Sequence, residues 1–220
     1  LIQRIELIEN RQEVLDRLER NVKSTYKEYR KVADEISKIR KEKAIQLQKD
    51  ISKECSDLYL DKTRFEVRFI ESDATSNGID KVEFLISTNI SEGLKPLAKV
   101  ASGGEISRVM LAIKSIFAQS DNIDTIIFDE IDTGISGKTS QSVAEEVKNL
   151  SKYMQIIMIT HQAIIASKSD MHIYVKKTQD DKTSVNISIL ENEDKLRAIA
   201  ELASGEVTKN SLDFAKTLIK

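Results

Sequence analysis

The sequence predicts an α/β fold that carries a long helix at its N-terminal end. Three observations lead to this prediction. The first glycine is Gly78 and the single proline is Pro96, so no helix-breaking residue interrupts residues 1–57. Apolar and polar residues alternate at residues 63–69 and 82–86, which is the period of a β-strand. Beyond Pro96, helical segments alternate with short unbroken apolar runs, which is typical of a parallel sheet covered on both faces.

Residues 1–57 show a heptad pattern that is strongest in the middle of the segment. One heptad position and the position three residues later carry Leu15, Leu18, Val22, Tyr29, Val32, Ile36 and Ile39. Charged residues fill nearly everything outside this narrow seam, so we expect one arm of a coiled coil. A helix that lies on a globular core is the alternative, and it stays open at this point.

The remaining elements follow in order along the chain. The two alternating segments predict a hairpin whose loop, residues 72–80, contains the turn-forming pair Asn77-Gly78. We then expect helices at residues 105–118 and 137–150, strands at 125–128 and 155–160, later strands at 172–176 and 184–190, and two short helices within 194–220. Ile106, Val109, Met110, Ile113 and Phe117 form the expected apolar face of the first of these helices.

Composition restricts the classes of function. Charged residues make up 32% of the 220 residues, but 34 basic side chains nearly balance 36 acidic ones, so the chain has no overall basic field for nucleic acid. Lys95, Lys99 and Arg108 gather locally, and we expect them to form a solvated basic face. The lone Cys55 cannot form an intramolecular disulfide, and neither a signal peptide nor a membrane-length apolar run occurs. These features predict a soluble protein in a reducing compartment.

The strongest chemical motif is TIIFDE at residues 125–130. A buried strand that ends in two adjacent carboxylates presents them at the carboxyl edge of a sheet, where open α/β folds bind ligands. The first carboxylate, Asp129, could hold Mg²⁺, and the second, Glu130, could orient an attacking water. Phosphoryl transfer requires this division of labour. A strand followed by an ordinary acidic turn is the structural alternative.

Two further segments point to the same ligand. The run SGGE at residues 102–105 precedes a predicted helix, and its serine and glycines expose O–H and N–H donors to an anion such as phosphate. An ordinary serine-capped helix is the alternative. The apolar strand at 155–160 is followed by His161, which places an imidazole at the same sheet edge as the two carboxylates. A purely structural histidine is the alternative there.

Taken in this order and spacing, the three motifs resemble the signature, Walker B and switch-histidine motifs of the ABC ATPase superfamily. Within it, KVASGGEISR at 99–108 and IFDEIDTGISG at 127–137 resemble the forms found in the RecN family of DNA repair ATPases. The resemblance implies the C-terminal lobe of an ABC/SMC-type ATPase head with a long N-terminal coiled-coil helix. Residues 1–57 would be the returning arm of an antiparallel coiled coil, and residues 58–220 would be the head part.

The resemblance also implies a mechanism in double-strand-break repair and recombination. Two heads would sandwich two ATP molecules with Mg²⁺, and hydrolysis would reset the tethering of DNA. Glu130 would be the general base, His161 the γ-phosphate sensor and Asp129 the metal ligand. The nucleotide-binding residues would be Ser102, Gly103, Gly104 and Glu105, which serve the partner head, and Asp132, which crosses the dimer seam.

The implied partners are a second copy of the head, the N-terminal half of the same protein, and double- or single-stranded DNA, in the bacterial cytoplasm at the nucleoid and without a membrane. Another SMC-like DNA repair head and a non-catalytic dimerisation module are the alternatives. Two departures stand out: Gln162-Ala163 replaces the usual Leu-Pro, and no GxxxxGK[S/T] phosphate-binding loop or Q-loop occurs. Because the chain begins at Leu1 rather than Met, we expect a piece that starts partway along the returning arm.

Overall fold

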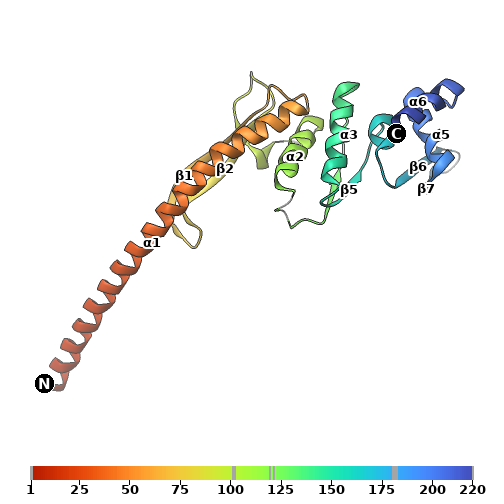
Figure 1. Cartoon of the computed structure of the whole chain (residues 1–220). Coiled ribbons are helices and arrows are strands. Elements are labelled where there is room, and N and C mark those ends of the chain that lie inside the picture. Colours follow the sequence, from red (N-terminus) through yellow and green to blue (C-terminus); the bar gives the residue numbers. More distant parts are fainter. Residues whose placement is uncertain (1, 101–102, 119, 121, 180–182, 220) are drawn as a thin grey trace. The chain divides into compact units, whose positions relative to one another are not determined.

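The computed structural model describes residues 2–100, 103–118, 120, 122–179 and 183–219 (Figure 1). The chain divides into two compact units. The first comprises Leu1–Lys49 and Glu66–Leu85, and the second comprises Asp50–Phe65 and Ile86–Lys220. Among the described residues, no helix combines the length and the apolar character needed to span a bilayer.

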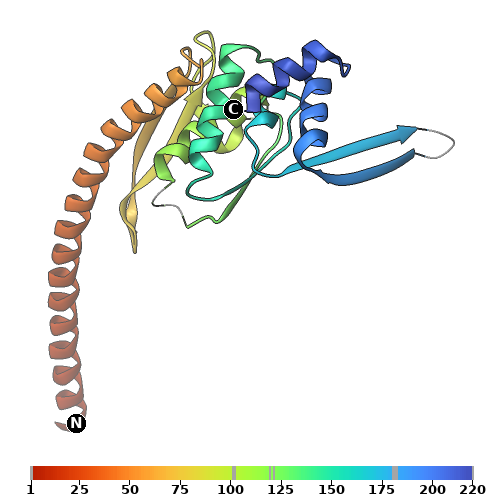
Figure 2. The same ribbon diagram turned by 45° about the vertical axis from the view of Figure 1, so that its right-hand side comes forward.

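The first unit is built on helix α1, which runs without interruption over Ile2–Asp57. The strands β1 (Arg64–Thr75) and β2 (Gly78–Ser87) lie along part of this helix (Figure 2). One face of the helix carries the small residues Ala33, Ser37 and Ala44, and all three are buried. Ser37 Oγ donates a hydrogen bond of 3.0 Å to Asp80 Oδ1 on β2. Small residues therefore let the hairpin approach the helix closely.

The heptad seam of α1 is only partly covered. Its residues Tyr29 and Ile36 are half-buried, and the Tyr29 hydroxyl donates to the Thr75 carbonyl oxygen on β1 at 3.0 Å. Leu15, Val22, Val32 and Ile39 are between 44% and 67% exposed, although their spacing is that of a helix-packing seam. The helix therefore packs on the hairpin with one face and leaves several apolar seam residues exposed. One arm of a coiled coil stays a prediction for this segment.

The hairpin turn is tighter than the sequence analysis predicted. A loop was expected over residues 72–80, but β1 continues to Thr75 and β2 begins at Gly78. Thr75 Oγ1 donates to the Gly78 carbonyl oxygen at 2.9 Å and accepts from the Asn77 N–H at 3.2 Å. Gly78 has φ +104°, a conformation that favours glycine. These local hydrogen bonds thus close the turn, and the polar residues on either side of it are part of the strands.

The two-residue strand β3 (Lys95–Pro96) adds to β2, giving the order β1-β2-β3, and the short helix η1 (Leu97–Lys99) follows.

The second unit contains the α/β part of the chain. Helix α2 (Gly104–Phe117) precedes β4 (Thr125–Phe128), and helix α3 (Lys138–Leu150) precedes β5 (Gln155–Met158). The strands β4 and β5 pair in parallel, with Phe128 opposite Met158, so the prediction of parallel strands is confirmed. Residues without accessible surface form the core between these elements, among them Val109, Leu111, Ile131 and Val143.

The buried face of α2 differs from the predicted one. Of the five residues expected on it only Val109 is buried, and Arg108, Leu111 and Ala112 are buried with it. The physical reason is that the loop after β4 packs on the Arg108 side of the helix, as the hydrogen bonds of Arg108 show. The helix is apolar on most of its surface, so periodicity alone did not identify which side is covered.

The C-terminal part of the second unit is a hairpin followed by two helices. The strands β6 (His172–Gln179) and β7 (Thr183–Leu190) pair in antiparallel fashion and extend away from the helices (Figure 2). Helices α5 (Asn192–Ser204) and α6 (Lys209–Ile219) bury Ile199, Ala200 and Ala215 against Ala163 of the short helix α4 (Ala163–Ser167), which was not predicted. This packing fixes the chain directly after the β5 turn.

Cys55 is buried in the second unit. Burial, together with the nearby charge of Glu54, raises the pKa of its thiol to about 11. The thiol is therefore protonated at neutral pH, and because the thiolate is the reactive form, Cys55 is a packing residue.

Candidate functional site

The carboxyl ends of β4 and β5 meet at one edge of the parallel pair. Phe128, the last residue of β4, is buried, and the two residues after it, Asp129 and Glu130, are exposed. The Ile159 N–H donates to the Phe128 carbonyl oxygen at 3.0 Å, so the pairing continues one step beyond β5. This step brings Thr160 and His161 beside the loop that begins at Asp129. The sequence-based expectation of a common sheet edge agrees with this geometry.

Glu130 adopts an unusual backbone conformation. Its φ is +60°, in the left-handed region, which costs a residue with a side chain about 1–2 kcal/mol. The next residue, Ile131, has no accessible surface, and the Thr133 N–H donates to the Glu130 carbonyl oxygen at 3.1 Å. The sharp turn therefore leaves the Glu130 carboxylate in solvent while the following side chain enters the core. No sequence pattern signalled this strain.

The two glycines before α2 differ in what surrounds them. A Cβ on Gly104 would lie 2.7 Å from the Thr133 carbonyl oxygen and 3.0 Å from that of Glu130. A Cβ on Gly103 would meet nothing within 4 Å, and the backbone there is extended. Close packing of α2 on the loop after β4 thus requires Gly104, whereas Gly103 is free of steric constraint from the described residues. Glu105 lies exposed in the first turn of α2, and Ser102 is outside the described residues.

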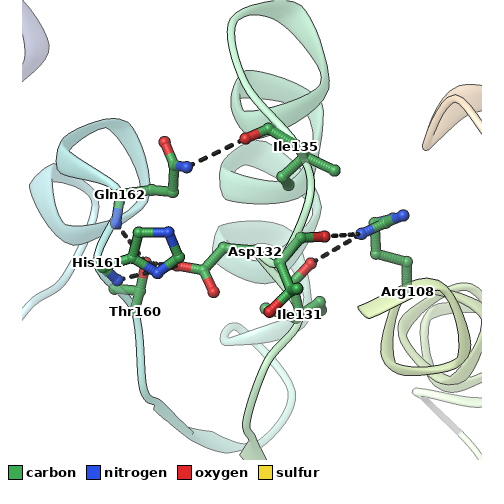
Figure 3. Close-up of polar contacts among 8 residues, drawn as sticks. Arg108, Ile131, Asp132, Ile135, Thr160, His161 and Gln162 are labelled. Carbon is green, nitrogen blue, oxygen red and sulfur yellow. Dashed lines mark hydrogen bonds and ion pairs between the residues drawn. The ribbon is translucent and has the colours of Figure 1, made fainter. Parts of the chain in front are cut away.

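Two polar side chains of α2 hold the loop after β4. Ser107 Oγ donates to the Asp129 carbonyl oxygen at 3.1 Å. Arg108 Nη1 donates to the carbonyl oxygens of Ile131 at 3.2 Å and Thr133 at 3.3 Å (Figure 3). Arg108 is buried, so the expectation that it belongs to a solvated basic face is wrong. Burial lowers the pKa of its guanidinium, and the charge of Glu105 opposes that change. The loop supplies two backbone acceptors for Nη1, whereas Nε is buried without a hydrogen-bond partner, so the buried cation is compensated in part.

Asp132 links the same loop to the turn after β5. Its side chain is 3% exposed, and Oδ2 accepts hydrogen bonds from Thr160 Oγ1 at 2.5 Å and from the His161 N–H at 2.9 Å. The same oxygen lies 3.2 Å from Nδ1 of His161 (Figure 3). The expected role of Asp132 at a dimer seam stays a prediction, and in this chain its side chain points toward the turn after β5. The donors on the β5 turn provide the physical reason, because a buried carboxylate needs hydrogen-bond partners.

Gln162, which departs from the family pattern, contributes to the same network. Its backbone N–H donates to Thr160 Oγ1 at 3.0 Å, and its Nε2 donates to the Ile135 carbonyl oxygen at 3.1 Å (Figure 3). The amide side chain thus adds a second connection between the loop after β4 and the turn after β5. The Gln162-Ala163 sequence leaves the turn well held.

The site offers few protein ligands for a metal. Within the described part of the chain, no group of three His, Cys, Asp or Glu side chains could together hold a metal ion. Mg²⁺ commonly binds through one or two carboxylates, with phosphate oxygens and water completing its shell. The exposed carboxylate of Asp129 fits a site of that kind, in which one protein carboxylate is joined by phosphate oxygens and water. It does not fit a site in which the protein supplies every ligand.

Comparison with solved structures defines the class of fold. The chain is similar to the Smc head domain with a coiled coil and joint from Pyrococcus yayanosii, with a TM-score of 0.52 and 20% identity, over 76% of this chain and 30% of that one. The fold is that of the C-terminal lobe of an ABC/SMC-type head with its long helix. No protein-family model matches the sequence.

Comparison with curated proteins identifies the family. The chain is 40% identical to the DNA repair protein RecN of Bacillus subtilis over 98% of its length, and 35% identical to that of Vibrio cholerae over all of it. The chain belongs to the RecN family. It spans about two fifths of the length of these relatives, 41% and 40% respectively.

Proposed function

We propose that this chain is part of a RecN-type ATPase that acts in DNA double-strand-break repair and recombination. The observation that supports this proposal most strongly is the contact between three motif segments: the start of α2, the loop after β4 and the turn after β5. Ser107 and Arg108 hold the loop, and Asp132 of the loop holds Thr160 and His161. The related RecN proteins are named as DNA repair proteins.

The proposed chemistry assigns one task to each exposed group at this edge. Glu130 accepts a proton from the water that attacks the γ-phosphate, and His161, whose side chain is 70% exposed, contacts that phosphate. Asp129 would hold Mg²⁺, which would neutralise charge on the phosphate oxygens when bound. The exposure of Asp129 and Glu130 leaves both carboxylates accessible to a nucleotide.

The proposal includes a second head as partner. Ser102, Gly103, Gly104 and Glu105 would serve the nucleotide of the other protomer, so that two ATP molecules lie between two heads. The open space around Gly103 supports this part, because a phosphate could approach its backbone closely. Hydrolysis would then separate the heads and change how DNA is tethered, in the bacterial cytoplasm at the nucleoid.

The N-terminal half of the same protein is the second proposed partner. Parallel sheets are normally covered on both faces, yet Ile127 of β4 is 64% exposed and Ile157 of β5 is 43% exposed. Further strands or helices from the rest of the protein would cover them. Likewise, the exposed seam of α1 supports residues 1–57 as the returning arm of a coiled coil, with residues 58–220 as the head part.

The proposal is tested by comparing this 220-residue chain with the full-length protein in an ATP hydrolysis assay. We expect no turnover from the chain alone, because it lacks a phosphate-binding loop, and magnesium-dependent turnover from the full-length protein that EDTA abolishes. A full-length protein that binds its partners but hydrolyses no ATP would instead support the non-catalytic dimerisation module. Another SMC-like repair head would show the same hydrolysis and differ in the DNA substrate that stimulates it.

A further inference from the structure

The buried carboxylate of Asp132 is surrounded by polar groups of the turn after β5. One oxygen, Oδ2, lies within hydrogen-bonding distance of three groups, namely Thr160 Oγ1, the His161 N–H and His161 Nδ1. The first two groups donate hydrogen bonds that hold the turn, and the third belongs to the imidazole ring. The side chain of Asp132 is 3% exposed, whereas the side chain of His161 is 70% exposed. The buried, hydrogen-bonded carboxylate of Asp132 thus lies next to the solvent-exposed imidazole ring of His161.

We propose that Asp132 is a positioning residue that orients His161 for ATP turnover. The carboxylate lies 3.2 Å from Nδ1 and would favour the imidazole tautomer that carries its proton there, so that Nε2 serves a ligand on the solvent-exposed side. Hydrogen bonds from the backbone and from Thr160 prevent the carboxylate from following the ring when it moves. The proposal rests on the proposed function, in which His161 contacts the γ-phosphate, and it gives Asp132 a task within its own head.

The loop that carries Asp132 is itself held from the opposite side. Arg108 of α2 donates to the carbonyl oxygens of Ile131 and Thr133, the residues on either side of Asp132. Gln162 donates to the Ile135 carbonyl oxygen from the side of the β5 turn. The loop around Asp132 is therefore held both by α2 and by the turn after β5, and the Asp132 side chain adds hydrogen bonds to that same turn. Preorganisation of this kind is what a catalytic group needs, since misplacement by about 1 Å can lower a rate by about 100-fold.

A double-mutant cycle in the full-length protein tests the proposal. The variants are Asp132→Asn, His161→Ala and the combination of both, and turnover, the KM for ATP and the melting temperature are measured for each. Asparagine keeps the shape of aspartate and one acceptor oxygen but carries no negative charge, so it holds the imidazole of His161 more weakly than the carboxylate does. We expect Asp132→Asn to lower kcat by about 10- to 100-fold with little change in KM.

The combination decides between positioning and general structural support. If Asp132 acts through His161, the double variant turns over ATP as fast as His161→Ala alone, because the second change has nothing left to misplace. Losses that multiply, or an Asp132→Asn variant with wild-type kcat, would overturn the proposal. Val143→Ala, which removes buried volume from α3 outside this network, is the control for lowered stability and is expected to leave kcat unchanged.

Failure of this proposal is distinguishable from failure of the proposed function. Glu130→Gln serves as the reference variant in the same assay. If Glu130→Gln is inactive and Asp132→Asn has wild-type kcat, only the role of Asp132 is refuted. If Glu130→Gln hydrolyses ATP normally, only the role of Glu130 as the base is refuted. If the unsubstituted full-length protein hydrolyses no ATP, the proposed function itself is refuted, and the role of Asp132 falls with it.

Discussion

Glu130→Gln is expected to reduce ATP turnover by the full-length protein by about 10²- to 10⁴-fold, which is the usual contribution of a general base. Glutamine keeps the length and shape of glutamate but cannot take a proton from water. The Glu130 side chain is exposed, so the substitution removes no packing. We therefore expect an unchanged melting temperature and unchanged ATP binding, measured beside steady-state hydrolysis.

Glu130→Gly provides the matched comparison, because it removes the same carboxylate and also the backbone strain. Glycine adopts φ +60° without the steric penalty of a Cβ, so this variant should be about as inactive as Glu130→Gln but more resistant to urea by about 1 kcal/mol. Such a result would show that the Glu130 side chain is kept at a cost in stability. A Gln variant that loses stability along with activity would contradict the role assigned to the carboxylate.

Gly104→Ala is expected to destabilise the head lobe by about 1–3 kcal/mol, which is typical of an overpacked interior position. The added methyl group would lie 2.7 Å from the Thr133 carbonyl oxygen, so either α2 or the loop after β4 must shift. Because that loop carries Asp129, Glu130 and Asp132, turnover should fall as well. Urea denaturation of the full-length protein and its ATP hydrolysis measure the two effects.

Gly103→Ala separates fold from function at the neighbouring position. Its Cβ would meet nothing within 4 Å among the described residues and its backbone is extended, so stability should equal that of the wild type. If the segment serves a nucleotide held by a second head, the methyl group blocks the close approach of the phosphate, and ATP-dependent dimerisation weakens. If Gly103→Ala and Gly104→Ala destabilise the protein equally, the steric difference between the two glycines has been assigned incorrectly.

Much of the fold could be predicted from the sequence because its signals are local. The absence of glycine and proline before Gly78 predicts α1, and the unbroken apolar runs predict the parallel pairing of β4 with β5, which the structure confirms. The prediction of a loop over residues 72–80 is wrong because the hydrogen bonds of Thr75 and Asn77 close a short turn. The other polar residues of this segment belong to the strands. The short helix α4 has too few residues to show a period.

The candidate site was predictable in its positions and less so in its contacts. Adjacency of the strand ends follows from parallel pairing, so Asp129, Glu130 and His161 could be placed together from the sequence. The inward direction of Asp132 and the burial of Arg108 could not, because a charged residue in a loop or on a helix is normally solvated. Both are explained by partners far along the chain, namely the turn after β5 for Asp132 and the loop after β4 for Arg108.

Hydrogen exchange of the full-length Glu130→Gln variant, with and without Mg²⁺ and ATP, tests the central claim most directly. If the start of α2, the loop after β4 and the turn after β5 form one nucleotide-facing edge, amide exchange should slow together in residues 103–108, 129–135 and 160–162 when ATP is bound. Exchange that stays unchanged in these three segments while another part of the protein becomes protected would contradict the account.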